Sequence, residues 1–523
     1  MQDGRRARRF AALALTAVLG GIVVGYRLDA RPLWDPDEAK HAEVAREMLV
    51  EGRWVEPLVN FEPYHHKPSA LYLAIGAAYR AFGTNELGAR FVSASCAWLT
   101  LLLVCAHGAR RSTIEGLLAA LLLGACGLFV MVGRFTNFDA PLTLCMTSAV
   151  LALARMVAHR RASDALLLYA SIGCAFLVKG PAALALIAVP ALVALWRGDL
   201  EWSDLELRRG LTLMSVIVGA WLVPTIIAAP NYLEEFLWVH NVERYLAPVG
   251  ADVFHPQPFW FFLPVLAGAL LPWSVWMPAA VVHVFTSPPD RSSRVLAEYS
   301  VWVVLFFSLS SGKLATYVLP AVPSLALLTA QWLIAERDDA RAGRIGTALS
   351  AGVCALLCPA VYLYLRYESP ALVGYAAVFL PVSLAGVAIV MMRGRASSLY
   401  AAAALSAALA VSVLAFNVFA AAAVSPWVSD ADLAAKAREY GRPRRVIAYR
   451  VRPFSFLFYT GWPMQYRVPL DAVREALYEP GGALLLTEDQ WMFHLAEAAP
   501  GVEFKELARN PRHVLYAVRS PWG

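Results

Sequence analysis

The stretch Trp34-Asp35-Pro36-Asp37-Glu38 decides how this 523-residue chain is interpreted. Further along the same loop the chain reads Tyr64-His65-His66-Lys67-Pro68. Carboxylates, two histidines and a lysine therefore lie between the first long apolar segment and the next one. Ionisable groups gathered beside a membrane are costly to bury and usually serve a function.

The surrounding composition is that of a membrane protein, with 59% hydrophobic and 16% charged residues. Apolar runs long enough to cross a bilayer recur about thirteen times, which predicts an all-α polytopic protein. Their approximate cores are 10–26, 88–107, 114–133, 141–157, 165–178, 181–196, 211–229, 259–286, 298–310, 314–335, 345–365, 372–392 and 398–424.

Arginines in alternate short loops predict the orientation of these spans. The loops expected in the cytoplasm carry Arg5, Arg6, Arg8, Arg9, Arg110-Arg111, Arg160-Arg161, Arg208-Arg209, Arg291, Arg294, Arg337, Arg341, Arg393 and Arg395. The loop with Asp37 and Lys67 is then outside, as is the tail after Val424. The first span is expected to be a retained anchor, because its apolar stretch is long for a signal peptide. The net charge of +6 follows this topology and does not indicate nucleic-acid binding.

Two domains are predicted: a transmembrane catalytic domain over 1–428, which includes an outward loop over 28–87, and a small outward α/β domain over 429–523. The loop is expected to form two amphipathic helices. Asp35 is the expected N-cap of the first, with Pro36 at the first helical position. The tail alternates predicted strands (445–450, 482–487, 513–519) with predicted helices (430–440, 470–478, 490–498). All seven cysteines fall in predicted spans, so no disulfide framework is expected.

Lys179 is the sharpest single signal in the apolar region, because a lysine at a span centre costs about 2.5–3.5 kcal/mol. A helix break at Gly180-Pro181 near the outer surface would relieve that cost. Lys313 repeats the pattern after Gly312. Other ionisable or polar residues predicted at the same face are His65, His66, Arg134, Asp139, His240, Arg244, His255 and Tyr317.

Each of these residues also has a simpler interpretation. Asp37 and Glu38 can merely stabilise a helix start, Lys67 can reach to the interface as an anchor, and Asp139 can cap the next span. Together, several cations beside carboxylates at one membrane face favour an anionic ligand. A phosphate at the membrane surface fits, because Lys and Arg are its usual partners.

The sequence also resembles a known family, the bacterial aminoarabinose-type lipid A transferases, which are relatives of the protein O-mannosyltransferases. The similarity runs in order through residues 30 to 330. Its motifs are Leu33–Glu43, Glu47-Met48, Gly52–Val55, Tyr64–Pro68, Phe138–Pro141, Lys179–Pro181, His240-Asn241, Glu243–Tyr245, His255, Pro258–Trp260, Lys313-Leu314 and Thr316-Tyr317.

This resemblance implies a GT-C glycosyltransferase with a polyprenyl-phosphate-linked sugar donor. The family's acidic pair falls on Asp37 and Glu38, and its lysine before proline falls on Lys67. The residue before that lysine is usually Glu in the family and is His66 here. His66 and His240 are therefore tentative ligands for a divalent metal (Zn, or Mg or Mn), and the expectation is that no cofactor is essential.

The implied mechanism is a single inverting displacement at the anomeric carbon, with Asp37 as general base or orienting carboxylate. The donor phosphate would be bound by Lys67, Lys179, Arg244, Tyr317 and Lys313. The acceptor or the sugar would contact Asp139 and Tyr64.

The expected acceptor is lipid A or a similar lipopolysaccharide, and the expected location is the periplasmic face of the bacterial inner membrane. A protein or polysaccharide acceptor remains an alternative. A transporter of lipid-linked sugars is a further alternative, but transporters place ionisable groups near the midplane and contain internal repeats. This sequence places them at one face and has no detectable repeat.

Overall fold

The computed structural model describes residues 2–232, 234–243, 256–286, 290–335, 341–392 and 395–522. Backbone contacts divide the chain into two compact units. We name them the helical unit (Met1–Leu28, His65–Leu71, Arg90–Phe419) and the mixed unit (Asp29–Tyr64, Tyr72–Ala89, Ala420–Gly523). Most of the first loop thus groups with the C-terminal segment, whereas the sequence analysis assigned the loop to the domain that contains the spans.

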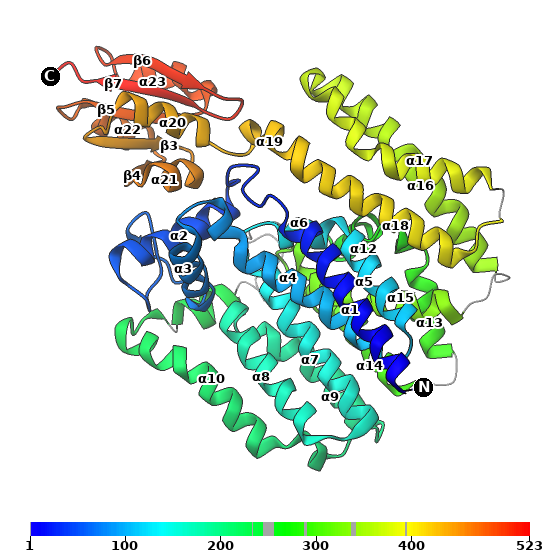
Figure 1. Ribbon diagram of the computed structural model, residues 1–523. Coiled ribbons are helices and arrows are strands. Elements are labelled where there is room, and N and C mark those ends of the chain that lie inside the picture. Colours follow the sequence, from blue (N-terminus) through cyan, green and yellow to red (C-terminus); the bar gives the residue numbers. More distant parts are fainter. Residues whose placement is uncertain are drawn as a thin grey trace. The chain divides into compact units, whose positions relative to one another are not determined.

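The helical unit contains a helix in every region that the sequence predicted as a span (Figure 1). Among the described residues, ten helices are long and apolar enough to cross a membrane. Helices α5 and α6 form an apolar pair bent by 75°, and the number of such segments is eleven if this pair is counted as one span. The helices are α1 (Gln2–Gly25), α4 (Glu86–Gly108), α5 (Thr113–Ala125), α6 (Gly127–Gly133), α7 (Asp139–His159), α8 (Ala162–Lys179), α9 (Ala182–Trp196), α10 (Leu207–Ala228), α12 (Phe262–Ala269), α13 (Met277–Thr286), α14 (Arg291–Leu309), α15 (Val322–Ala335), α16 (Arg341–Glu368), α17 (Leu380–Met391) and α18 (Ser398–Ala415).

Burial distinguishes central helices from lipid-facing ones. In α7, 78% of the most apolar 18-residue stretch is buried inside the protein, whereas in the span that contains α10 only 11% of the corresponding stretch is buried. The exposed side chains of α10 include Leu211, Val216, Val223 and Ile227, which would be unfavourable in water. Helices α7, α8 and α10 run side by side in Figure 1. The chain is therefore a multi-span membrane protein.

Two predicted helix breaks are present, each beside a lysine. Helix α8 ends at Lys179, and Gly180 has a φ of 75° with a ψ of −150°, a conformation that favours glycine. Pro181 then precedes α9. Likewise, α14 ends at Leu309, and a 3-10 helix over Ala315–Ala321 begins after Lys313.

In the mixed unit, the first loop forms α2 (Asp37–Glu51), a hairpin of β1 (Leu58–Val59) and β2 (Glu62–Pro63), and α3 (Ala70–Phe82). Both expected helices are present. The predicted N-cap is wrong, however. Helix α2 begins at Asp37 after Pro36, and the cap position makes no side-chain hydrogen bond. The Asp35 carboxylate instead accepts hydrogen bonds from the C-terminal segment, as described below.

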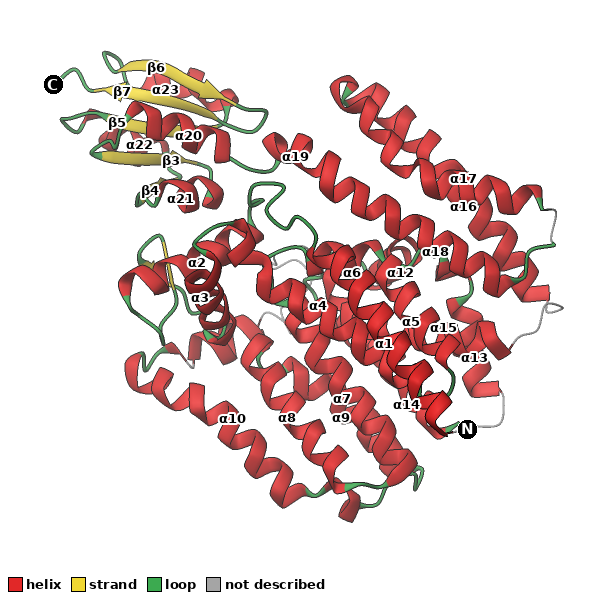
Figure 2. Cartoon of the chain, in the orientation of Figure 1, coloured by secondary structure: helices red, strands yellow, loops and turns green. Residues whose placement is uncertain are grey.

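The C-terminal part of the mixed unit is a five-stranded sheet in the order β4-β3-β5-β7-β6 (Figure 2). Strand β3 is parallel to β4 and β5, and β7 is antiparallel to β5 and β6. The elements are α20 (Ala431–Tyr440), β3 (Arg445–Tyr449), α21 (Phe454–Thr460), β4 (Met464–Arg467), α22 (Leu470–Tyr478), β5 (Ala483–Thr487), α23 (Met492–Ala498), β6 (Glu503–Arg509) and β7 (Val514–Arg519). The three predicted strands and three predicted helices are confirmed, and β4, β6 and α21 were missed.

The period-2 alternation of strand side chains explains why both sheet faces are covered. Val446 and Ala448 pack in one apolar cluster with α20 and α21. Ile447 and Tyr449 pack in the other with α22 and α23. The sheet is thus a layer between two pairs of helices, with the small α/β fold that the sequence predicted.

Candidate active site

The first part of the candidate site lies in the helical unit, where α7 begins and α8 ends. Lys179 and Asp139 form an ion pair between these two helix ends. The Lys179 ammonium also lies 4.9 Å from the ring centroid of Tyr317, a cation–π distance. The structure therefore brings together three of the predicted site residues from three separate regions of the sequence.

Asp139 is not the residue that caps α7. The Asn137 side-chain oxygen accepts hydrogen bonds from the backbone N–H groups of Asp139 (2.8 Å) and Ala140 (3.0 Å). The Asp139 carboxylate is directed to Lys179 instead. Its simpler interpretation as a helix cap is therefore wrong, and an ionic role is available to it.

Lys313 is buried among backbone carbonyl groups. Its ammonium donates to the carbonyl oxygens of Gln257 (2.9 Å) and Ser310 (2.5 Å), and burial lowers its pKa. These bonds fix the break between α14 and the next helical segment. The geometry favours a structural role for Lys313 over a phosphate contact.

The backbone around Lys67 is anchored within the helical unit. The Lys67 carbonyl accepts a hydrogen bond from the Tyr232 hydroxyl at 2.6 Å, and Trp221 donates to the Ser69 hydroxyl at 2.6 Å. His65 contacts Glu235 at 2.8 Å. The Lys67 side chain is half-buried and His66 is exposed. A rigid backbone of this kind holds a lysine in a fixed place for a ligand.

The acidic pair belongs to the mixed unit, and its two members have opposite surroundings. The Asp37 side chain is 62% exposed and pairs with Lys40 at 2.6 Å. Glu38 is fully buried, accepts two hydrogen bonds from Arg31, and accepts a third from the Trp34 backbone N–H at 2.8 Å. Only Asp37 is thus accessible enough to act on a substrate, and Glu38 fits a positioning role.

Four further predicted residues contribute less to the site. Tyr64 is buried in the mixed unit. Arg244 and the side chain of His240 lie outside the described residues, as does His255. Within the described part of the chain, no group of three or more His, Cys, Asp or Glu side chains could hold a metal ion. The metal site over His66 and His240 stays a prediction.

Arg134, expected at the outward face, has a structural place. Its guanidinium donates to the carbonyl oxygens of Val23 (3.1 Å), Tyr26 (2.8 Å) and Arg27 (3.2 Å) at the end of α1. Such bonds satisfy the last carbonyl groups of a helix, which have no partner inside it.

Sequence reasoning missed a second buried acidic group on α2. Glu43 and Glu47 are both fully buried. Glu43 binds Arg46 through two hydrogen bonds, and Glu47 accepts from the backbone N–H groups of Asn60 and Phe61, both at 2.8 Å. These two turn residues have positive φ values of 55° and 64°. Glu47 thereby stabilises a turn that β-hairpins favour but that phenylalanine rarely adopts.

Burial, together with the hydrogen bond and negative charge of Glu43, raises the pKa of Glu47 to about 8, although the Phe61 N–H and Arg46 oppose the shift. The Glu-x-x-x-Glu spacing could have suggested that both carboxylates share one helix face. Their partners in the hairpin could not be inferred from spacing.

The architecture and these residues define a class: a polytopic membrane protein with a broken-helix cation site, an acidic loop helix and a small α/β region. A family model described as dolichyl-phosphate-mannose-protein mannosyltransferase matches residues 66–227.

Similar proteins narrow the class further. The undecaprenyl phosphate-alpha-4-amino-4-deoxy-L-arabinose arabinosyl transferase of Erwinia tasmaniensis is 35% identical over 314 residues, which are 58% of this chain and 56% of that protein. The protein from Sodalis glossinidius that has the same name followed by the number 1 is 34% identical over 363 residues, which are 66% of this chain and 63% of that protein. The chain thus matches about three fifths of the length of these curated relatives.

The fold similarity extends over nearly the whole chain. The crystal structure of ArnT from Cupriavidus metallidurans bound to undecaprenyl phosphate superimposes with a TM-score of 0.81, at 22% identity, over 97% of both chains. The crystal structure of the same ArnT in the apo state superimposes with a TM-score of 0.80. The chain therefore has the fold of this ArnT and is similar in sequence to the aminoarabinose transferases, as the sequence motifs indicated.

Proposed function

We propose that the protein is a glycosyltransferase of the bacterial inner membrane. It transfers a sugar from a polyprenyl-phosphate donor to a lipid A-type acceptor at the periplasmic face. The observation that carries this proposal is the exposed Asp37 at the start of α2, in a chain whose relatives are named as undecaprenyl-phosphate-dependent arabinosyl transferases. Because those names specify 4-amino-4-deoxy-L-arabinose, that sugar is the first donor to test.

In the proposed reaction an acceptor oxygen attacks the anomeric carbon of the donor sugar. The new C–O bond forms as the bond from that carbon to the phosphate oxygen breaks, and the polyprenyl phosphate leaves. Asp37 takes the acceptor proton or orients the acceptor. Lys67, Lys179 and Arg244 hold the phosphate, and Tyr317 donates a hydrogen bond to it. Charge that grows on the leaving phosphate is then stabilised by fixed cations.

The cations are suited to this role because a phosphate offers more than one oxygen to them. In the described structure Lys179 is already paired with Asp139. A phosphate that approaches Lys179 would share the ammonium with Asp139, whose carboxylate would then be positioned beside the donor sugar. Asp139 could accept a hydrogen bond from that sugar.

The decisive experiment compares Asp37→Asn with wild type and with Glu51→Gln, an exposed carboxylate at the other end of α2. Purified proteins in nanodiscs receive the undecaprenyl-phosphate aminosugar and lipid A, and mass spectrometry follows the product. Asp37→Asn should lower turnover by about 10²–10⁴-fold, the contribution of a positioned base. Glu51→Gln should react like wild type. Near-normal turnover by Asp37→Asn would exclude Asp37 as the base.

A protein acceptor is the second candidate, because the family model that matches residues 66–227 is described as a protein mannosyltransferase. Comparison of envelope lipids and glycoproteins from cells with and without the protein separates the two. Loss of a modified lipid supports the first candidate, and loss of a modified protein supports the second.

A further inference from the structure

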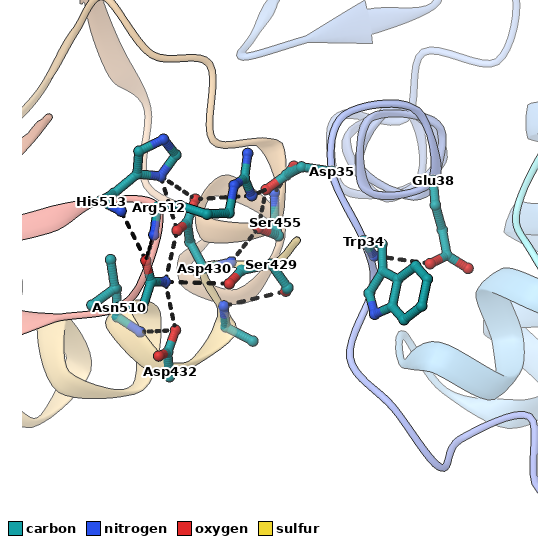
Figure 3. A network of polar contacts seen from close by, with 12 residues as sticks. Trp34, Asp35, Glu38, Ser429, Asp430, Asp432, Ser455, Asn510, Arg512 and His513 are labelled. Carbon is teal, nitrogen blue, oxygen red and sulfur yellow. Dashed lines mark hydrogen bonds and ion pairs between the residues drawn. The ribbon is translucent and has the colours of Figure 1, made fainter. Parts of the chain in front are cut away.

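The first observation concerns Asp35, two residues before the proposed catalytic carboxylate. Its side chain is completely buried, and Figure 3 shows it directed toward the C-terminal segment, residues 420–522. One carboxylate oxygen accepts from the Ser455 backbone N–H at 2.9 Å. The other accepts from the Ser455 hydroxyl at 2.5 Å and from Arg512 at 2.9 Å. All four lone-pair directions of a carboxylate can accept hydrogen bonds, and three are used here.

The second observation concerns the residues behind Arg512. Its guanidinium lies between two buried carboxylates, 2.9 Å from Asp35 and 3.7 Å from Asp430. Asp430 is held in turn by His513 at 2.9 Å and by the Asn510 amide at 3.0 Å (Figure 3). The network therefore has several directional bonds, and its members cannot shift independently.

The third observation is that the contact covers consecutive residues. Three more hydrogen bonds join this stretch to the C-terminal segment: Leu33 N to the Tyr459 hydroxyl (2.9 Å), Trp34 Nε1 to the Ser425 hydroxyl (2.9 Å) and Asp35 N to the Val428 carbonyl (2.8 Å). Residues 33–35 are thus fixed one after another, immediately before α2.

The fourth observation links the segment to the partner of Asp37. The Lys40 ammonium pairs with Asp37 at 2.6 Å and lies 5.8 Å from the ring centroid of Phe454, at the start of α21. Helix α2 also packs against α21. The C-terminal segment therefore contacts the start of α2 on both sides of Asp37 in the sequence.

We infer that the C-terminal segment is a positioning element for the catalytic loop, in which Asp35 and Arg512 hold the start of α2 so that Asp37 points toward the substrate. This inference rests on the proposed function for its catalytic meaning. Neither residue needs to touch the substrate. Their effect is transmitted through Pro36, the one residue between Asp35 and Asp37.

The chemistry of the network distinguishes positioning from simple adhesion. Burying an ion pair costs desolvation free energy, and well-packed apolar residues often hold two surfaces together equally well. Bonds to both oxygens of Asp35 instead fix the direction of the carboxylate and of the backbone that carries it. Displacement of a catalytic group by about 1 Å can lower a rate by roughly 10²-fold.

The test uses the full-length protein in nanodiscs with three variants. Arg512→Gln removes the charge and Arg512→Lys retains it. Ser455→Ala removes the hydroxyl that donates to Asp35 and accepts from the Asp430 backbone N–H, while the bond from the Ser455 backbone N–H to Asp35 remains. Arg509→Gln is the matched control, because Arg509 forms an exposed ion pair with Glu506 in the same sheet region. Hydrogen–deuterium exchange is measured over residues 33–51, together with kcat and the Kd for undecaprenyl phosphate.

Arg512→Gln should accelerate exchange over residues 33–51 and lower kcat by about 10- to 100-fold. The Kd should stay within about twofold of wild type, because the proposed phosphate ligands are elsewhere. Arg512→Lys should recover part of kcat, Ser455→Ala should give a smaller loss, and Arg509→Gln should match wild type.

The outcomes separate this inference from the proposed function. If wild type transfers no sugar, the proposed function is wrong, and faster exchange in Arg512→Gln still supports the coupling. If Arg512→Gln and Ser455→Ala match wild type in exchange and in kcat, the inference is overturned. A weaker Kd with unchanged kcat also overturns it. If Arg512→Gln does not fold, Ser455→Ala decides by the same two measurements.

Discussion

At the scale of the residue, Asp37 and Glu38 show how neighbours in one motif can differ in their surroundings. Successive residues of an α-helix are about 100° apart around its axis, so one can face solvent while the next faces the interior. The sequence predicted that the pair is important. It could not separate an exposed Asp37 from a buried Glu38, because the partner Arg31 carries no recognisable spacing signal.

The helix break beside Lys179 and Gly180 was more predictable than the different surroundings of Asp37 and Glu38. The Lys179 break was inferred from the free-energy cost of a buried cation and from Gly180-Pro181, and the break is present. Its partner Asp139 was named as a site residue, but the ion pair between them needs the tertiary arrangement of α7 and α8.

Donor binding is tested by replacing three cations one at a time. Each of Lys67→Ala, Lys179→Ala and Arg244→Ala should weaken binding of undecaprenyl phosphate by about 10- to 150-fold, because a charge-assisted hydrogen bond contributes about 1.5–3 kcal/mol. Lys67→Ala should have the largest effect. Direct binding in nanodiscs measures this, with Arg509→Gln as control. Wild-type affinity in all three variants would assign the cations to interfacial anchoring.

Metal dependence forms a separate prediction. Treatment with EDTA should leave turnover unchanged, because the phosphate leaving group needs no further activation when Lys67 and its neighbours bind it. Turnover of treated and untreated enzyme is compared with the same donor. Loss of turnover that zinc restores would instead assign a metal to His66 and His240.

At the scale of the element, strands with alternating apolar residues were predictable and edge strands were not. Strand β3 presents apolar side chains to both faces, a pattern typical of a central strand. Strand β6 is largely exposed and carries charged residues, and β4 has only four residues. Neither presents the hydrophobic pattern that strand prediction depends on.

Helix α2 carries a testable pH dependence. The pKa of Glu47 is about 8 in the fold, against an ordinary value of 4.5, so the folded protein binds more protons than the unfolded chain between these values. Stability should therefore fall as pH rises from about 4.5 to about 8. Glu43, Arg46, Tyr466 and the backbone N–H groups of Asn60 and Phe61 surround this carboxyl group.

The Tm of the purified protein is measured at about pH 5, 6.5 and 8, which covers the interval between the ordinary and the raised pKa of Glu47. Glu47→Gln should flatten the decline, because an amide does not ionise. Glu51→Gln, exposed on the same helix, should keep the wild-type slope. Identical slopes for all three proteins would contradict the assignment to Glu47.

At the scale of the whole molecule, hydropathy predicted the helices of the membrane region in order. The grouping of the first loop with the C-terminal segment could not be predicted, because it depends on hydrogen bonds such as Asp35 to Ser455 between distant parts of the sequence. Ser455 does not stand out in its own sequence context, and Asp35 was expected to cap a helix within its own loop.

The orientation of the whole chain in the membrane can be tested. The arginine-rich loops place the C-terminus outside the cytoplasm. Alkaline phosphatase fused to the C-terminus should therefore be active, and a cytoplasm-dependent fluorescent reporter should not. Reporters fused after Arg161, in a loop expected inside, should give the opposite result and serve as control. A cytoplasmic signal at the C-terminus would refute the orientation.

The bond between Asp35 and Arg512 also has a consequence for biosynthesis, because 477 positions separate the two residues. Ribosomes add roughly 5–20 residues per second, so about 25 to 100 seconds pass between synthesis of the first partner and the second. During that interval the start of α2 has no Arg512 to hold it. A nascent chain would therefore insert its helices before Arg512 is available to hold its acidic loop, and a chain terminated before Arg512 would lack this bond.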